Sequence, residues 1–419
     1  MYRSVRLPSK VCRSVHEHVE GGHIVNRTRT LRVAVVGAGI GGLTAGIALR
    51  ARGIDATVYE QASELKALGA GVSIATNGSR ILTRLGLGDR LHAVAGAFDR
   101  YAFRNWQGDP IAGEPSRLSF GDPATTWFLH RGEFQQVLSD ALPTGALRLG
   151  HRVVGATEHA DGIEVDFADG TSVEADLLIG ADGIHSHIQG MVSEPADPVS
   201  EGVMAYRALI PTDRLDGVVD MSICAMWLGP QRSFLTYPVS DGALLNVVAF
   251  APTNLDVIES WTAPGDVNEL ADTYAGWDPR VGDIIGAMDA TFRWGIYDRE
   301  PLDRWSTGRI ALLGDSAHAV TPHLGQGANQ AVEDAATLAV VLRDCDPIDI
   351  PARLRVYGGL RRDRTRLVRE SARDAGRTYR STDLTGLEQA ERIGAIFAGI
   401  DVNTHDAESI AEMALAAAG

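Results

Sequence analysis

A glycine-rich turn near the start of the chain restricts the fold more than any other feature of the sequence. Residues 31–60 read LRVAVVGAGIGGLTAGIALRARGIDATVYE: a β-branched run, the turn GAGIGG, an apolar stretch of helical period and a second β-branched run. Gly37 allows a tight turn, Gly39 lets a ligand approach the backbone, and Gly42 lets the helix pack closely on the strand. The sequence therefore predicts a strand, a helix and a strand that open a doubly wound α/β domain.

The same unit has the features of a dinucleotide site. The free amides at the helix N-terminus, including that of Ile40, can bind a pyrophosphate. Glu60 ends the second strand 60 − 42 = 18 residues after Gly42, where a carboxylate can bind both hydroxyls of a ribose that has no 2′-phosphate. These features predict NAD or FAD in a Rossmann-like domain. The alternative is a tight turn whose glycines serve packing alone.

Composition excludes several other phosphate chemistries. The only lysines are Lys10 and Lys66, and neither stands in a P-loop. P-loop NTPases, protein kinases and pyridoxal-phosphate enzymes all need a lysine in their site, so the sequence excludes these three classes. Backbone amides, helix N-termini and arginines must therefore hold the cofactor phosphates. The net charge of −15 and the pI near 5.2 make nucleic acid an unexpected partner. The ten arginines of residues 353–380 predict a solvated helix.

The order of strand, helix and turn patterns predicts two domains that interrupt each other. A discontinuous cofactor-binding domain is expected at residues 31–100, 126–195 and 296–345. An inserted antiparallel β-sheet is expected to form the substrate domain, at residues 101–125 and 196–295.

The two ends of the chain and its cysteines give simpler expectations. Residues 346–419 are predicted to form a helical C-terminal region. Residues 1–30 have six basic and two acidic side chains and no apolar core, which predicts a disordered or extraneous extension and not a secretory signal. Three widely spaced cysteines fit a reducing compartment such as the cytoplasm. No apolar run approaches the ~18 residues of a membrane helix, so no membrane partner is expected.

Three further segments resemble the signatures of one enzyme family. GRIALLGDSAHAVTPHLGQGANQAVEDAATLA at 308–339 closely resembles the C-terminal FAD motif of the aromatic-ring flavoprotein monooxygenases, which include salicylate and hydroxybenzoate hydroxylases. DLLIGADGIHSHIQ at 176–189 is similar to the Asp-Gly motif of that family, and LHRGEF at 129–134 is similar to a third signature. Together with the first turn, all four signatures follow the order of the family, and the resemblance covers about residues 31–380.

The resemblance implies an enzyme that contains tightly but non-covalently bound FAD. NADPH or NADH would reduce the flavin as a transient co-substrate, and O2 would then form a flavin C4a-hydroperoxide. One oxygen atom would pass to a small aromatic substrate of phenolic or hydroxybenzoate type. Two alternatives stay open. One is an FAD monooxygenase that epoxidises or tailors a non-phenolic natural product, and the other is a non-catalytic flavin-containing protein that binds a small molecule.

The 308–339 segment contains residues that suit a flavin. Asp315 is expected to end a buried strand, from which its carboxylate can accept hydrogen bonds from the ribityl hydroxyls. Gly325 and Gly327 lead into a helix that is expected to start near Ala328. The amides and dipole of this helix start can stabilise negative charge on the N1–C2 carbonyl edge of reduced flavin. The alternative for Asp315 is a turn or helix cap.

Other cofactor contacts come only from the resemblance. It places Arg131 near the ribityl chain or the pyrophosphate, and the alternative is a surface ion pair. It also places Asp182 and Gly183 at the pyrophosphate, directly or through water. For this pair the alternative is a structural turn after a buried strand.

The histidines divide into one catalytic candidate and one discarded pair. His323 follows Pro322 in the loop that would line the flavin ring, where an imidazole of ordinary pKa near ~6.5 can deprotonate a phenol. The alternative is a loop histidine bonded to backbone. His185 and His187 form an HxH pair with no further ligand at metal spacing, so no metal site is expected.

The remaining substrate candidates lie on expected strands of the inserted sheet. Tyr237 in SFLTYPV resembles a family strand that ends in Tyr-Pro and often has a histidine four residues earlier, where this chain has Ser233. Tyr237 can bond a substrate oxygen or serve packing alone. Arg207 can pair with a substrate carboxylate, and the alternative is a structural salt bridge. Its neighbour Tyr206 is a further candidate for substrate contact.

Overall fold

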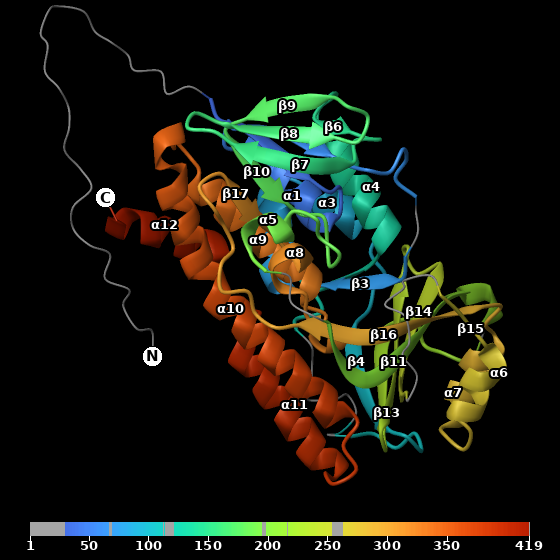
Figure 1. The fold of residues 1–419 in the computed structure, drawn as a ribbon. Coiled ribbons are helices and arrows are strands. Elements are labelled where there is room, and N and C mark those ends of the chain that lie inside the picture. Colours follow the sequence, from blue (N-terminus) through green and yellow to red (C-terminus); the bar gives the residue numbers. More distant parts are fainter. Residues whose placement is uncertain are drawn as a thin grey trace, which may run out of the picture.

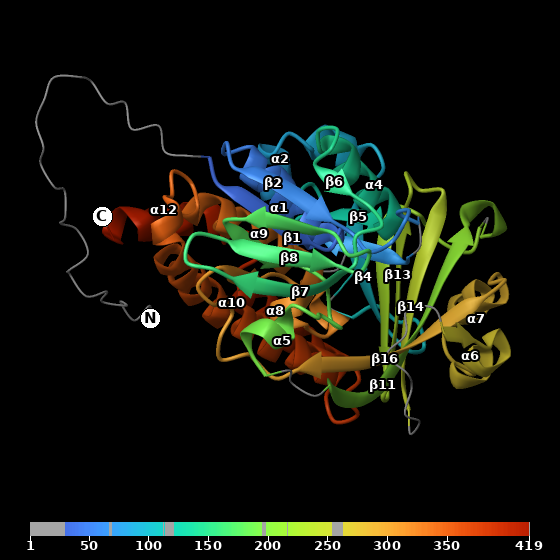
Figure 2. The same cartoon turned by 45° about the horizontal axis from the view of Figure 1, so that its top comes forward.

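The computed structural model describes residues 30–66, 69–111, 113, 121–194, 198–215, 217–253 and 263–418. Apart from its last residue, the extension predicted for residues 1–30 lies outside this part of the chain. Two sheets of different kind lie beside a helical C-terminal region, as Figures 1 and 2 show. This arrangement has the α/β, inserted-sheet and helical parts that the sequence predicts.

The first sheet is parallel and has the strand order β17-β10-β1-β2-β6. Its strands are β1 (Arg32–Val36), β2 (Asp55–Tyr59), β6 (Leu147–Arg148), β10 (Leu177–Gly180) and β17 (Ile310–Leu312). Strands β1, β10 and β17 are almost continuously apolar and buried, as expected for a parallel sheet covered on both faces, whereas β2 alternates between buried and more exposed residues. A three-stranded antiparallel sheet packs on β1 and β10, and its strands are β7 (Val153–Glu158), β8 (Ile163–Phe167) and β9 (Ser172–Ala175).

Helix α1 (Ile40–Arg50) follows the glycine turn, and α9 (Gly327–Val341) packs on it. The other helices of this part are α2 (Thr76–Arg84), α3 (Gly88–His92), α4 (Arg131–Ala141), α5 (Gln189–Val192) and α8 (Asp315–His318). The pair β3 (Gly71–Ile74) and β5 (Trp127–His130) forms a small antiparallel sheet. An amide of this pair reaches the second sheet, because the Gly71 N–H donates to Oδ1 of Asn246 at 2.7 Å.

The second sheet has the order β15-β16-β11-β14-β13-β12-β4 and is antiparallel except where β4 meets β12. Its strands are β4 (Arg100–Asn105), β11 (Pro198–Pro211), β12 (Ile223–Gly229), β13 (Arg232–Val239), β14 (Leu244–Pro252), β15 (Ala263–Gly265) and β16 (Thr291–Arg299). One face packs on α6 (Val267–Thr273) and α7 (Pro279–Gly286), visible at the far right of Figure 1. The domain boundary expected between residues 295 and 296 falls inside β16.

The C-terminal region consists of α10 (Ile350–Tyr379), α11 (Gly386–Ile400) and α12 (Ala407–Ala418). Short 3-10 turns lie at Thr212–Arg214, Pro322–Leu324 and Pro347–Asp349. Helix α10 has 30 residues and is about 45 Å long, at about 1.5 Å per residue. It runs along the molecule from α9 to the second sheet (Figure 1), where α11 packs beside it. No helix in the described part of the chain is long and apolar enough to cross a membrane.

The prediction of a solvated arginine helix is wrong for the inner face of α10. Arg361, Arg364 and Arg369 are 2%, 9% and 6% exposed. Each pairs with acidic side chains from other elements; Arg369, for example, lies 3.3 Å from Asp298 and 2.8 Å from Glu300. Composition alone could not reveal this, because the carboxylates that neutralise these arginines lie far away in the sequence.

Candidate active site

A cavity between the two sheets brings together most of the residues that the sequence singled out. Its walls come mainly from the turn after β1, from β3, from the loop between β17 and α9, and from five strands of the second sheet, namely β11, β12, β13, β14 and β16. The predicted residues in its walls are Gly39, Ile40, Arg131, Gly183, Arg207, Tyr237, Asp315, Pro322, His323, Gly325, Gly327 and Ala328. The predicted residues outside its walls are Gly37, Gly42, Glu60, Asp182 and Tyr206.

The turn after β1 needs its glycines. Gly37 has a φ of +104°, and a Cβ there would collide with the backbone of Ala181. A Cβ on Gly42 would collide with the carbonyl of Gly37, whereas one on Gly39 would enter open space. Helix α1 begins without a side-chain cap, and its first residues line the cavity. This open helix start fits the pyrophosphate of a dinucleotide.

Glu60 lies beside this turn. Its Oε2 accepts the N–H of Ala38 at 2.8 Å, and its Oε1 accepts the N–H of Ala62 at 2.9 Å. Gln135 of α4 donates to the Ala38 carbonyl at 2.7 Å. These bonds hold the carboxylate next to the phosphate cradle. Its role as a ribose ligand stays a prediction.

The loop before α9 forms the other end of the cofactor region. Gly325 has a φ of +63°, and α9 begins at Gly327 without a side-chain cap. Asn329 Nδ2 donates to the carbonyls of Gly325 at 2.8 Å and Ser73 at 3.0 Å, while its Oδ1 accepts the Ala75 N–H at 2.9 Å. Asn329 therefore fastens the loop to β3. Sequence reasoning missed this residue, although it stands two positions after the second glycine of the loop.

Asp315 and Asp182 are the two aspartates that the sequence places at the cofactor. Asp315 does not end a strand, because β17 stops at Leu312 and the left-handed Gly314 turns the chain into α8, which Asp315 begins. It is exposed and lines the cavity. Asp182 accepts bonds from its own loop, at 2.5 Å from Ser186 Oγ and 2.7 Å from the His187 N–H. The contact of Asp182 with the pyrophosphate stays a prediction, and its neighbour Gly183 lines the cavity.

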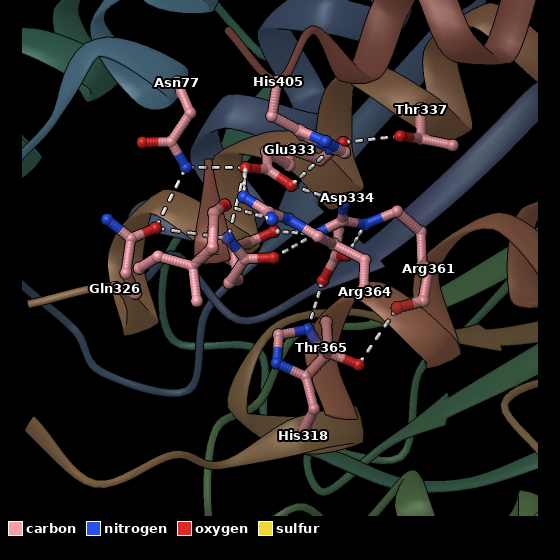
Figure 3. Close-up of polar contacts among 12 residues, drawn as sticks. Asn77, His318, Gln326, Glu333, Asp334, Thr337, Arg361, Arg364, Thr365 and His405 are labelled. Carbon is pink, nitrogen blue, oxygen red and sulfur yellow. Dashed lines mark hydrogen bonds and ion pairs between the residues drawn. The ribbon is translucent and has the colours of Figure 1, made fainter. Parts of the chain in front are cut away.

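A buried ionic cluster joins α9 to neighbouring segments, and Figure 3 shows its members. Arg361 of α10 lies 2.5 Å from Glu333 and 2.7 Å from Asp334, and both carboxylates are 0% exposed. His318 of α8 lies 2.5 Å from Asp334, and His405 lies 3.4 Å from Glu333. Burial alone would raise the pKa of Glu333, but the charge of Arg361 holds it well below its usual value. The cluster thus ties α9 to α8, α10 and the segment before α12.

Arg207 projects from β11 into the cavity. Its guanidinium carbon lies 5.6 Å from the ring centre of Trp294, and its Nη2 donates weakly to the Gly71 carbonyl at 3.4 Å. Burial lowers the pKa of Arg207, and no carboxylate among the described residues pairs with it. The alternative of a structural salt bridge therefore does not apply within the described chain. Tyr206 points to the opposite face, into the core with α6 and α7, because neighbours on a strand alternate in direction.

Tyr237 forms part of an aromatic wall. Its ring stacks on Phe128 with centroids 4.3 Å apart. Burial raises the pKa of Tyr237 to about 12, so its hydroxyl stays protonated at neutral pH. Ser233 is fully buried on the same strand but does not line the cavity. The departure from the family pattern at Ser233 therefore leaves this part of the wall without a polar side chain from that position.

His323 lies in the cavity wall, but its ring is bonded to a side chain and not to backbone. Its Nε2 lies 2.9 Å from Oε2 of Glu201. Burial lowers the pKa of His323, although this contact with Glu201 opposes the effect. The sequence did not reveal Glu201, because the two residues are 122 positions apart. The role of His323 as a base stays a prediction.

Comparison with protein families decides between NAD and FAD. The family described as FAD binding domain matches residues 30–345, which is most of the chain. The chain belongs to this FAD-binding family. Its cofactor is therefore FAD, and the open starts of α1 and α9 fit that cofactor because both line one cavity.

Relatives of this FAD-binding protein are named as monooxygenases and hydroxylases. The 3-amino-4-hydroxybenzoate 2-monooxygenase PtmB3 of Streptomyces platensis is 38% identical over 357 residues, which cover 84% of this chain and 89% of the relative. Salicylate hydroxylase of Pseudomonas putida is 31% identical, covering 85% and 88%. A solved salicylate hydroxylase substrate complex matches with a TM-score of 0.80 and 29% identity, covering 92% of this chain and 98% of that one.

This member of the FAD-binding family is an FAD-dependent monooxygenase that hydroxylates an aromatic substrate with NAD(P)H and O2. The predictions of fold class, family, enzyme class and cofactors are confirmed. The expectation of an enzyme thus prevails over the alternative of a non-catalytic flavin-binding protein. Among the described residues no cluster of side chains is suited to a metal ion.

Proposed function

We propose that the substrate is an aromatic carboxylic acid with a ring hydroxyl, of the hydroxybenzoate type, and that Arg207 binds its carboxylate. The observation that carries this proposal is a guanidinium in the cavity wall that pairs with no carboxylate among the described residues. A cation in a partly desolvated place is costly unless an anion pairs with it. A planar carboxylate can accept two parallel bonds from a guanidinium, which supplies both energy and orientation.

The rest of the wall suits a flat ring beside that carboxylate. Phe128, Tyr237, Leu235, Val248 and Phe250 provide apolar and aromatic surface. The protonated hydroxyl of Tyr237 can donate to a substrate oxygen. Such walls also exclude water from the reacting atoms. The names of two relatives agree in chemistry, because 3-amino-4-hydroxybenzoate and 6-hydroxynicotinate are both ring carboxylates with a hydroxyl.

The cofactor contacts are proposed as follows. The open start of α1 binds the pyrophosphate, Asp315 and Arg131 lie along the ribityl chain, and the start of α9 faces the flavin ring. Bound FAD supplies the redox chemistry with NAD(P)H and O2. The protein positions the ring, keeps water away and, through His323, removes the proton of the substrate hydroxyl.

A paired substrate screen tests the proposal. The purified holoenzyme is assayed for stimulated NAD(P)H oxidation and hydroxylated product with 4-hydroxybenzoate and salicylate, each against its methyl ester. We expect the acids to give product and the esters to give little. Equal turnover of acid and ester would show that no carboxylate is recognised. Stimulation without product would mean that the ligand is bound in an unproductive orientation, against the proposed role of the wall.

We also propose that the enzyme works in the cytoplasm. Cys224 and Cys345 are both free and buried, which agrees with a reducing compartment. Fractionation of the native cells with an antibody tests this directly, and a signal in a secreted fraction would contradict it.

A further inference from the structure

Side-chain amides connect the buried ionic cluster to the loop in which α9 begins (Figure 3). Asn77 of α2 donates from Nδ2 to Oε1 of Glu333 at 2.6 Å and to Oε1 of Gln326 at 3.0 Å. Gln330 of α9 makes the same two contacts, because its Nε2 donates to these oxygens at 3.1 Å and 3.2 Å. All four residues are at most 1% exposed, so water does not compete for the bonds.

The charge of Glu333 fixes the direction of these bonds. Its carboxylate stays ionised, because the charge of Arg361 lowers its pKa by more than burial raises it. An ionised carboxylate only accepts hydrogen bonds, so Asn77 and Gln330 must both present their NH2 groups to it. Each NH2 group has a second hydrogen, and Oε1 of Gln326 accepts it in both cases. One buried charge therefore orients three amides and holds the side-chain oxygen of Gln326 inside the protein.

Gln326 links this network to the wall of the cavity. It is the residue before α9 and lies between Gly325 and Gly327, which both line the cavity. A side chain in this position commonly accepts one of the free N–H groups of the helix. Here Gln326 makes no such cap, since Asn77 and Gln330 occupy its oxygen. The network thus holds the loop from inside and leaves the first amides of α9 free on the cavity side.

Asn77 can reach this loop because α2 and α9 approach each other closely. A Cβ on Gly78 would lie only 2.5 Å from Oδ1 of Asn329. The same Oδ1 accepts the N–H of Ala75, the residue before α2, at 2.9 Å. The starts of the two helices are therefore fastened to each other, and the position of the first amides of α9 depends on α2.

We propose that Asn77 is a positioning residue that acts through Gln326: it fixes the first amides of α9 and thereby raises the midpoint potential of bound FAD. The proposal rests on the proposed placement of the start of α9 against the flavin ring. Reduced flavin has negative charge at this edge that oxidised flavin lacks, so amides that point at it bind the reduced form more strongly. Fixed dipoles stabilise such charge best, because they need not reorient when it forms.

The midpoint potential of the flavin tests the proposal without substrate or turnover. The wild-type and Asn77→Ala holoenzymes are reduced stepwise without oxygen, together with a dye of known potential, and the flavin absorbance is recorded. We expect Asn77→Ala to weaken the binding of reduced relative to oxidised flavin about tenfold, which lowers the two-electron potential by about 30 mV. A wild-type potential in Asn77→Ala would overturn the proposal.

A second substitution shows whether Asn77 acts through Gln326. Gln326→Met keeps a side chain of similar length but removes the oxygen that accepts from Asn77, so it should lower the potential as well. If the two residues act through their bond, the double variant should have the potential of a single variant. Shifts that simply add would mean that the residues act separately, against the proposal. Should Asn77→Ala fail to retain flavin, Gln326→Met alone decides, and a wild-type potential there overturns the proposal.

A matched control separates this role from general support of α9. Thr337 lies on α9, is 1% exposed, and donates from its hydroxyl to the Glu333 carbonyl at 2.8 Å. It stands eleven residues after Gln326, about 16 Å along the helix. Thr337→Val removes a buried bond far from the loop and should keep the wild-type potential. Equal shifts in Thr337→Val and Asn77→Ala would assign Asn77 a merely structural role.

A last variant tests the placement on which the proposal rests. Ala328 lines the cavity at the start of α9, so the carboxylate of Ala328→Asp should lower the potential of the flavin or weaken its binding. Wild-type potential and flavin content in Ala328→Asp would mean that α9 does not face the flavin ring, and the proposed placement would fail together with the role of Asn77. An effect in Ala328→Asp without one in Asn77→Ala would overturn the role of Asn77 alone.

Discussion

Arg361 and Arg207 are both cations turned toward the interior, yet their surroundings differ completely. Arg361 of α10 contacts the carboxylates of Glu333 and Asp334 within 2.7 Å. Arg207, in the cavity, has the face of Trp294 and a weak bond to a backbone carbonyl, with no carboxylate among the described residues. Carboxylates of the chain itself balance the charge of Arg361. Arg207 has no carboxylate partner among the described residues, and we propose that the substrate supplies the anion.

This difference separates stability from function. Breaking a buried ion pair strongly destabilises the folded protein, because the remaining partner stays buried and charged. An unpaired charge in a cavity wall contributes little to the folded state, and it gains a partner only when ligand binds. Substitutions in the two regions should therefore change different measurements.

The largest effect on stability is expected among the buried ion pairs of Arg361. Arg361→Met removes the arginine that contacts both buried carboxylates and should lower the free energy of unfolding by about 3–5 kcal/mol. Urea unfolding of the holoenzyme measures this. Arg366, which is 52% exposed and pairs with Asp363, provides the control, since Arg366→Gln should change stability by about 0.5 kcal/mol or less. Similar losses of stability in the two variants would show that the buried ion pairs of Arg361 contribute no more to stability than an exposed pair.

The next largest effect is expected at Arg207, and it concerns the affinity for the substrate. Arg207→Met should unfold at nearly the same urea concentration as the wild type and keep its flavin. Its affinity for hydroxybenzoates should fall by about 2 kcal/mol or more, which is about 30-fold. Titration of the flavin absorbance measures the affinity. The methyl esters should lose much less affinity, and an equal loss for acid and ester would mean that Arg207 shapes the cavity and does not bind the carboxylate.

Asp315 tests the cofactor end of the same cavity. Asp315→Ala should weaken FAD binding about tenfold, since it removes acceptors for the ribityl hydroxyls at about 1.5 kcal/mol. The ratio of flavin to protein after dilution and gel filtration measures this. Asp363→Ala, at a side chain 88% exposed on α10, is the control and should stay fully loaded. Full occupancy in Asp315→Ala would refute the assigned contact.

The smallest effect is expected in an ion pair that is only partly buried. Two bonds from Arg84 lower the pKa of Asp406 from its usual 3.8 to about 2. The stabilisation is therefore present above about pH 4 and is lost as the pH falls toward 2. Asp406→Asn should be less stable by about 1 kcal/mol at neutral pH, and the difference should disappear in acid. A difference that does not depend on pH would show that charge is not its cause.

The cofactor turn could be predicted because its constraints are local. The left-handed φ of Gly37 and the collision of any Cβ at Gly42 involve residues a few positions apart, and such constraints appear as fixed spacings. The strand period likewise placed Tyr237 and Arg207 on the second sheet, but it did not say which of Tyr206 and Arg207 faces the cavity. That choice depends on which face packs on α6 and α7.

The chain by itself thus determined the glycine turn, the loop before α9, the use of arginine in place of lysine and, through its signatures, the FAD-binding family. Only the tertiary structure decided which arginines are paired, that Asp315 begins a helix, and that Glu201 meets His323. Backbone limits on a turn act over a few residues and leave a pattern in the sequence. Burial and charge pairing join residues more than a hundred positions apart, so they exist only once the sheets and α10 have packed together.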